Sequence, residues 1–162
     1  MSASKYLPHV FVLPEDDANL QIASEFNARL DGLPQRQMQV LVPAGGWSEV
    51  LDLFEKVHIA EMRRCLNRSM ILLIDFDGNM GRLQQAKNKI PVDLGDRVFV
   101  LGAWRDPETL KPRLGSYETI GTRMAADCRD STTNCWGDDH LQHNAAELAR
   151  LGVYVVPTIL FP

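Results

Sequence analysis

The chain has 162 residues, of which 45% are hydrophobic and 23% are charged, and its formal net charge at pH 7 is −4. This length and composition are typical of one globular domain whose hydrophobic core needs no disulfide or metal to stabilise it. No apolar run reaches the roughly 20 residues of a membrane-spanning helix, and the N-terminus lacks the apolar segment of a signal peptide. We therefore expect a single domain over residues 1–162 in the cytoplasm.

The net negative charge disfavours strong nucleic-acid binding by the isolated chain, because affinity for phosphate backbones depends on clustered Lys and Arg side chains. The cysteines are odd in number, lie far apart in the sequence and form no C-x-x-C pair: Cys65, Cys128 and Cys135. This pattern indicates reduced thiols rather than a disulfide framework or a zinc site.

Short apolar runs bounded by turn residues predict strands that are buried on both faces of a parallel sheet. They occupy residues 9–13, 38–42, 71–74 and 97–101. Apolar residues at helical spacing lie between these runs, over residues 17–30, 48–65 and 79–89. The alternation predicts right-handed βαβ crossovers and a Rossmann-like, three-layer α/β fold with about four parallel strands. The strand order cannot be read from the sequence.

The helix boundaries follow from capping residues. Asp16 or Asp17, Ser48 and Asn79 are the expected N-caps of the three helices, and Asp31-Gly32 with Pro34 is expected to end the first helix.

After about residue 112 the pattern becomes helical. One helix is expected along Tyr117 to Cys128, and another along Leu141 to Leu148 with Asp138 or Asp139 as its cap. Residues 153–161 are apolar but contain Pro157, which predicts an edge strand or an extended tail. The sequence thus predicts a core over about 9–112 and a helical C-terminal extension over about 113–162.

Acidic residues follow three of the predicted strands. Glu15 follows the first, Asp75 and Asp77 end the third, and Glu108 lies just beyond the fourth. The carboxyl ends of parallel strands meet at one edge of the sheet, where ligands collect. Carboxylates gathered there suit Mg²⁺ or Mn²⁺. We therefore expect a metal site built from Glu15, Asp75, Asp77 and Glu108.

Some of these acids have a structural alternative. Asp77-Gly78 can be simple turn residues, and Glu108 lies where the first turn of a helix often carries an acid. Asp16 and Asp17 are better explained as a helix cap than as metal ligands. Asp75 is different, because a carboxylate directly after a buried strand is costly unless a cation or hydrogen bonds compensate it.

The order of these motifs resembles the Toprim domain, in which a glutamate follows strand one and Asp-x-Asp follows strand three. In particular the chain resembles small bacterial Toprim-like proteins of the type related to OLD-family nucleases. The matching segments are 11–16, 42–46, 72–77 with Arg82 following, and 98–110.

The resemblance implies a Mg²⁺-dependent nuclease or related phosphodiester chemistry. By position, Asp75 and Asp77 would hold the metal, Glu15 would be a further ligand or a general base, and Arg82 would face the scissile phosphate. OLD-type Toprim domains commonly work with an ATPase, so an ATPase partner that supplies nucleic-acid contacts is also implied. Two positions depart from the pattern, since Asp16 replaces the usual glycine and Asn79 stands where a third acid would be.

Two other functions remain open. The segment Leu72 to Asn79 also resembles the first motif of haloacid dehalogenase-type phosphatases, in which Asp75 would be the nucleophile. That motif belongs on the first strand of such a domain, whereas two predicted strand–helix units precede it here. The other alternative is a catalytically silent Toprim-like module that binds a partner.

Overall fold

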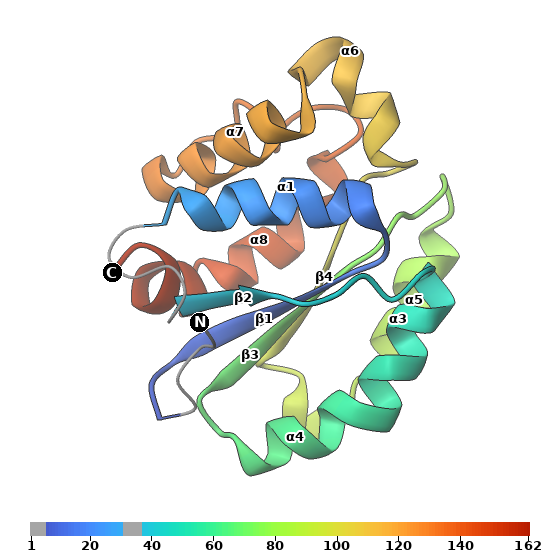
Figure 1. Cartoon of the computed structure of the whole chain (residues 1–162), viewed down its shortest axis with the longest axis vertical. Helices are drawn as coiled ribbons and strands as arrows, with labels where there is room; N and C mark the ends of the chain where they lie inside the picture. The colour runs from blue at the N-terminus through green and yellow to red at the C-terminus, as the bar shows by residue number, and fades with distance from the viewer. Residues whose placement is uncertain (1–5, 31–36) are drawn as a thin grey trace.

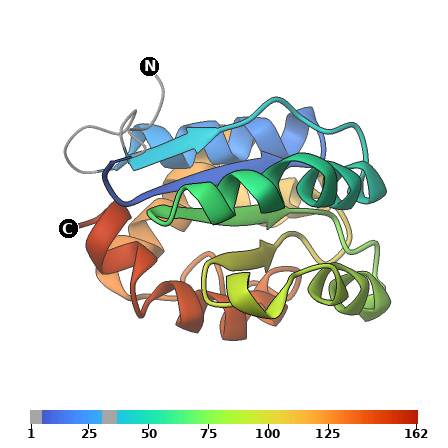
Figure 2. The same cartoon turned by 90° about the horizontal axis from the view of Figure 1, so that it is seen from below.

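The computed structural model describes residues 6–30 and 37–162 and has the predicted α/β architecture. Its sheet has four parallel strands in the order β2-β1-β3-β4. The strands are β1 (His9–Pro14), β2 (Met38–Val40), β3 (Arg68–Leu73) and β4 (Val98–Leu101). Figure 2 shows them side by side in this order.

Helices cover both faces of the sheet (Figure 1). The α-helices are α1 (Asp17–Ala28), α3 (Trp47–Leu53), α4 (Ile59–Arg64), α5 (Met80–Asn88), α6 (Lys111–Leu114), α7 (Tyr117–Asp130) and α8 (Ala145–Leu151). Shorter 3-10 or π segments are η1 (Phe54–His58), η2 (Val92–Leu94), η3 (Pro107–Leu110), η4 (Gln142–Asn144) and η5 (Val156–Leu160). The predicted helix over 48–65 is present as the continuous run α3–η1–α4. None of the helices among residues 6–30 and 37–162 is long and apolar enough to cross a membrane.

Successive strand residues point to opposite faces, so each face of the sheet has its own core. Val10, Ile71 and Phe99 pack with α1, α7 and α8 on one face. Met70 and Leu72 pack with α3, α4 and α5 on the other. Because both faces are covered, the strands read as continuous apolar runs rather than as alternating ones.

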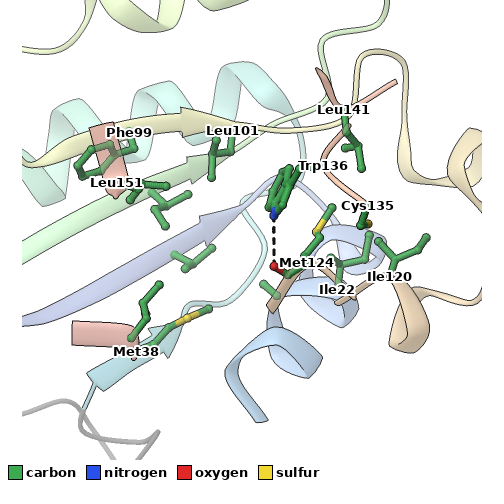
Figure 3. Close-up of a cluster of buried hydrophobic side chains, with 14 of the residues drawn as sticks. Ile22, Met38, Phe99, Leu101, Ile120, Met124, Cys135, Trp136, Leu141 and Leu151 are labelled. Carbon is green, nitrogen blue, oxygen red and sulfur yellow. Dashed lines mark hydrogen bonds between the residues drawn. The ribbon is translucent and has the colours of Figure 1, made fainter. Parts of the chain in front are cut away.

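The core beneath α1 and α7 is shown in Figure 3. Ile22 from α1 and Met124 from α7 lie there with Trp136, whose side chain is 8% exposed. The indole Nε1–H of Trp136 donates to the carbonyl of Met124 at 3.2 Å, which satisfies the polar atom of this buried aromatic.

The C-terminal extension adds helices to the fold and also pairs with the outer edge of β4. As an edge strand, β4 would leave backbone N–H and C=O groups without partners. The N–H of Val100 donates to Glu147 at 3.0 Å, and the N–H of Gly102 donates to Asn144 Oδ1 at 3.1 Å. Asn144 Nδ2 donates in turn to the carbonyl of Gly102 at 3.0 Å, and Arg150 donates to the carbonyl of Val98 at 3.3 Å. Side chains of η4 and α8 thus take the place of a fifth strand.

Several local predictions are wrong. Residues 153–161 form no edge strand, because Val156–Leu160 is the π-helical η5, in which Ile159 and Leu160 are buried. Pro157 is tolerated there because it lies in the first turn of the helix, where its missing N–H is not needed.

The predicted N-caps are partly right. Asp16 caps α1 by accepting from the N–H of Asn19 at 3.0 Å, and Asn79 caps α5 by accepting from the N–H of Gly81 at 2.8 Å. Ser48 is no cap, because α3 begins one residue earlier and Gly46 is its N-cap.

The ends of two other helices also differ from expectation. α1 ends at Ala28, and the predicted stop signals Asp31-Gly32 and Pro34 lie outside the described residues. Asp138 does not cap α8, which begins only at Ala145. Its carboxylate instead accepts from the N–H of His140 and pairs with Arg113, which fixes the loop before η4.

The edge contacts of β4 can be tested by Asn144→Leu, which keeps a similar volume but removes the amide. The N–H of Gly102 would then be buried without a partner, so we expect a loss of about 2 kcal/mol in the free energy of unfolding. Urea denaturation measures this loss. Gln142→Ala on the exposed side of the same segment is the control and should change stability by less than about 0.5 kcal/mol. Equal effects of the two substitutions would contradict the pairing.

Candidate active site

The candidate site lies at the carboxyl ends of β1 and β3, which pair in parallel up to Pro14 and Leu73. Glu15 follows directly, and its N–H donates to the carbonyl of Leu73 at 2.9 Å. Its carboxylate Oε2 accepts from the backbone N–H of Asp75 at 2.6 Å. The strand order therefore brings together two acids that are 60 residues apart in the chain.

This position is also the topological switch point of the sheet. β2 lies on one side of the β1–β3 pair and β4 on the other. The connections leave β1 and β3 toward opposite faces of the sheet, and in open α/β sheets ligands bind at such a point. Glu15 and Asp75, the first part of the site expected from the sequence, lie at this switch point.

Asn19 joins two acids of the site, and the sequence analysis did not identify it. Its side-chain amide is 2% exposed and donates to Asp75 Oδ1 and to Asp16 Oδ1, each at 3.0 Å. A signal for it was present in the sequence. Asn19 precedes Ile22, Ala23 and Phe26 at helical spacing, so it is a polar residue on the buried face of α1.

Burial and negative neighbours make ionisation of Asp75 costly. Burial is the main cause that raises its pKa to about 7, against the lowering effect of the Asn19 hydrogen bond. The charges of Glu15, Asp16 and Asp106 raise it further. Asp106, which caps η3 by accepting from the N–H of Thr109 at 3.2 Å, is a second residue that sequence reasoning missed.

The pKa of Glu15 is also raised, chiefly by burial. The hydrogen bond from the N–H of Asp75 opposes this rise, Asp16 adds to it, and Arg82 opposes it. Each of the two paired acids is therefore harder to ionise than a solvent-exposed carboxyl.

Arg82 belongs to the site through the backbone of Asp75. Its Nη1 donates to the carbonyl of Asp75 at 2.9 Å, and its guanidinium carbon lies 4.8 Å from the centre of the Trp47 ring. Its Nη2 lies 3.5 Å from Asp77 Oδ2. Arg82 thus carries a positive charge to the edge where the acids meet.

Asp77 is part of a turn. It has a φ of +51°, is followed by Gly78 at +69°, and its side chain is 69% exposed. The N–H groups of both residues bond to carbonyls of the segment after β4, at Arg105 and Trp104. The turn alternative is therefore realised, while the Asp77 carboxylate faces Arg82.

Glu108 has its contacts elsewhere. Its carboxylate accepts from the hydroxyl of Tyr117 at 2.7 Å and lies 3.4 Å from the ammonium of Lys111. The Tyr117 hydrogen bond is the main cause that lowers its pKa. Both contacts are with the segment that begins at η3, and neither connects Glu108 with Glu15 or Asp75.

The donor set decides what kind of metal site would fit. In the described part of the chain, no three His, Cys, Asp or Glu side chains are arranged so that they could hold a metal ion together. Glu15 and Asp75 form a pair of carboxylates. Mg²⁺ is commonly held by one or two carboxylates together with water and substrate phosphates. The residues therefore fit a two-carboxylate site that a substrate completes, and not a cage made by the protein alone.

Comparison of the chain with protein-family models, with curated proteins and with solved structures found no match.

The raised pKa of Asp75 predicts a pH dependence of stability. With its pKa raised to about 7, the folded protein holds this proton up to about that pH, whereas the unfolded chain releases it near 3.8, the ordinary pKa of an aspartate. Stability should therefore fall as pH rises through this window. Asp75→Asn removes that cost, and we expect it to raise the free energy of unfolding by about 1–3 kcal/mol at pH 8 in metal-free buffer and by little at pH 4.

Asp127→Asn is a matched control, because the pKa of Asp127 is shifted in the opposite direction from that of Asp75. Burial alone would raise the pKa of Asp127, but hydrogen bonds from Thr132, Trp136, Cys135 and Asn134 lower it on balance. This substitution should destabilise the protein at neutral pH and less so in acid. Urea denaturation from pH 4 to 8 measures both profiles. If the stability of Asp75→Asn changes with pH in parallel with the stability of the unmodified protein, the raised pKa of Asp75 is contradicted.

Proposed function

We propose that this protein catalyses Mg²⁺-dependent phosphodiester cleavage or transfer of the Toprim type at the carboxyl ends of β1 and β3. The observation that carries the proposal is the hydrogen bond that the backbone N–H of Asp75 donates to the Glu15 carboxylate at 2.6 Å, at the switch point of the sheet. The two carboxylates also interact, since the charge of Glu15 raises the pKa of Asp75, and this supports the proposed Toprim-type arrangement.

The electrostatics support a functional role for the pair. Two neighbouring carboxyls with raised pKa values cost folding free energy, and such groups cluster at functional sites. A bound cation would compensate this cost, because it favours the ionised form of each acid. The hydrogen bond from Asn19 holds Asp75 in position, and the charges of Asp16 and Asp106 help to raise its pKa. None of these three residues is required as a metal ligand.

The chain's residues have distinct proposed roles. Asp75 and Glu15 hold the metal, with Glu15 also available as a general base, while the Asp77 carboxylate in the exposed turn faces Arg82. Arg82, fixed to the backbone of Asp75, binds a phosphate oxygen of the substrate. Bound Mg²⁺ would polarise the phosphoryl group. The resemblance to OLD-type proteins adds an ATPase partner as a proposed source of nucleic-acid contacts.

Metal binding is tested by thermal unfolding with and without Mg²⁺. At ten times its dissociation constant, Mg²⁺ should stabilise the protein by about 1.4 kcal/mol, or roughly 3–5 °C in Tm. Asp75→Asn should abolish the shift. Glu108→Gln is the control, since the contacts of Glu108 lie elsewhere, and it should retain the shift. The proposal fails if neither Mg²⁺ nor Mn²⁺ changes the Tm of the unmodified protein.

Catalysis is tested with plasmid DNA and short single strands in Mg²⁺. Asp75→Asn and Glu15→Gln should each lower the cleavage rate by at least about 100-fold, because each removes a carboxylate of the proposed centre. Folding of both variants is checked by circular dichroism.

Two outcomes would favour the other functions. Hydrolysis of a generic phosphate ester that depends on Asp75 while DNA stays intact indicates a phosphatase. Absence of any hydrolysis, together with absence of a metal effect, indicates a binding module.

A further inference from the structure

A concave site lies beside the candidate active site. It is an open pocket of ≈ 470 Å³ lined by Met80, Trp104, Asp139, Gln142 and His143. Ligand pockets in proteins commonly measure about 300–1,000 Å³, so the space suits a small ligand or part of one.

The pocket adjoins the active-site edge through backbone pairing. The segment after β3 runs beside the segment after β4, since the N–H of Phe76 donates to Ala103 at 3.1 Å and the N–H of Gly78 donates to Trp104 at 2.7 Å. Asp75 immediately precedes this paired segment, and Met80 at the start of α5 follows it. The pocket residues Trp104 and Met80 thus lie along the segment that leads away from Asp75.

The pocket wall combines flat rings with polar groups. The centres of the Trp104 and His143 rings lie 5.5 Å apart, and those of the His143 and Phe76 rings lie 5.0 Å apart in a T-shaped arrangement. His143 Nε2 bonds to the carbonyl of Gly102 at 2.8 Å, which makes Nε2 the protonated nitrogen. Its other nitrogen, Nδ1, is a buried acceptor without a hydrogen-bond partner in the described structure. Gln142 and Asp139 add an exposed amide and an exposed carboxylate.

We propose that this pocket binds the nucleobase of the substrate. The inference rests on the proposed phosphodiester chemistry and names its substrate class, which is a nucleotide or an unpaired nucleic-acid end. An aromatic face beside side-chain hydrogen-bonding groups is the chemistry that recognises unpaired bases. A base inside a duplex is stacked and cannot enter such a pocket.

The charge of the chain favours the same substrate. Binding to a long phosphate backbone requires many cations, whereas this chain has a net charge of −4. Stacking on Trp104 would contribute affinity without any cation. The Asp139 carboxylate can only accept hydrogen bonds when ionised, which favours bases that present an exocyclic amino group, as adenine, cytosine and guanine do, over uracil, which offers only its ring N–H.

The test is isothermal titration calorimetry of the full chain with AMP, CMP, UMP and inorganic phosphate in metal-free buffer. AMP and CMP should bind at least about tenfold more tightly than UMP or phosphate. Trp104→Ala should weaken AMP binding at least about tenfold, and Trp104→Phe, which keeps an aromatic face, should stay within about threefold. Asp139→Asn should reduce the preference for AMP over UMP while leaving the fold intact, because the residue is exposed.

The outcomes separate this inference from the proposed function. Equal binding of all four ligands, or unchanged AMP binding in Trp104→Ala, overturns the base pocket even if Mg²⁺ still raises the Tm. Selective AMP binding that depends on Trp104 supports the pocket even if Mg²⁺ has no effect, in which case the proposed metal chemistry fails and the pocket stands.

Discussion

The parallel pairing of β1 with β3 is the constraint on which the rest of the molecule depends. It extends from His9↔Arg68 to Pro14↔Leu73 and places these two strands at the centre of the sheet. The same pairing makes Glu15 and Asp75 neighbours, and the helices that follow the two strands, α1 and α5, pack on opposite faces of the sheet. The fold and the candidate site therefore share one physical cause.

The site also carries a cost that the surrounding structure must offset. Burial places Asp75 where its charged form is unfavourable, and Asn19, itself almost fully buried, donates to it from α1. The close packing of α1 against α7 supports this position, because a Cβ at Gly121 would come within 2.4 Å of the carbonyl of Ile22. The helix that positions Asn19 is thus held tightly by the C-terminal extension.

The extension further protects the far edge of the sheet. Backbone groups along the outer edge of β4 form hydrogen bonds with the side chains of Asn144, Glu147 and Arg150, as they would with the backbone of a neighbouring strand. This arrangement explains how a sheet of four strands avoids an open edge on that side without a fifth strand. It also places the loop with Asp139 and His143 next to Trp104, which forms the pocket beside the acids.

The sequence by itself determined the α/β class, the four strands and most helices, because apolar periodicity and caps such as Asp16 and Asn79 act within a few residues of chain. It also indicated Glu15 and Asp75, since charged residues after buried runs stand out locally, and the resemblance to Toprim-like proteins added Arg82. Only the tertiary structure decided the strand order, the role of Asn19, the separate contacts of Glu108 and the helical form of residues 156–160. Each of these depends on partners far away in the chain, and a hydrogen bond or burial between distant segments leaves no periodic signal in either of them.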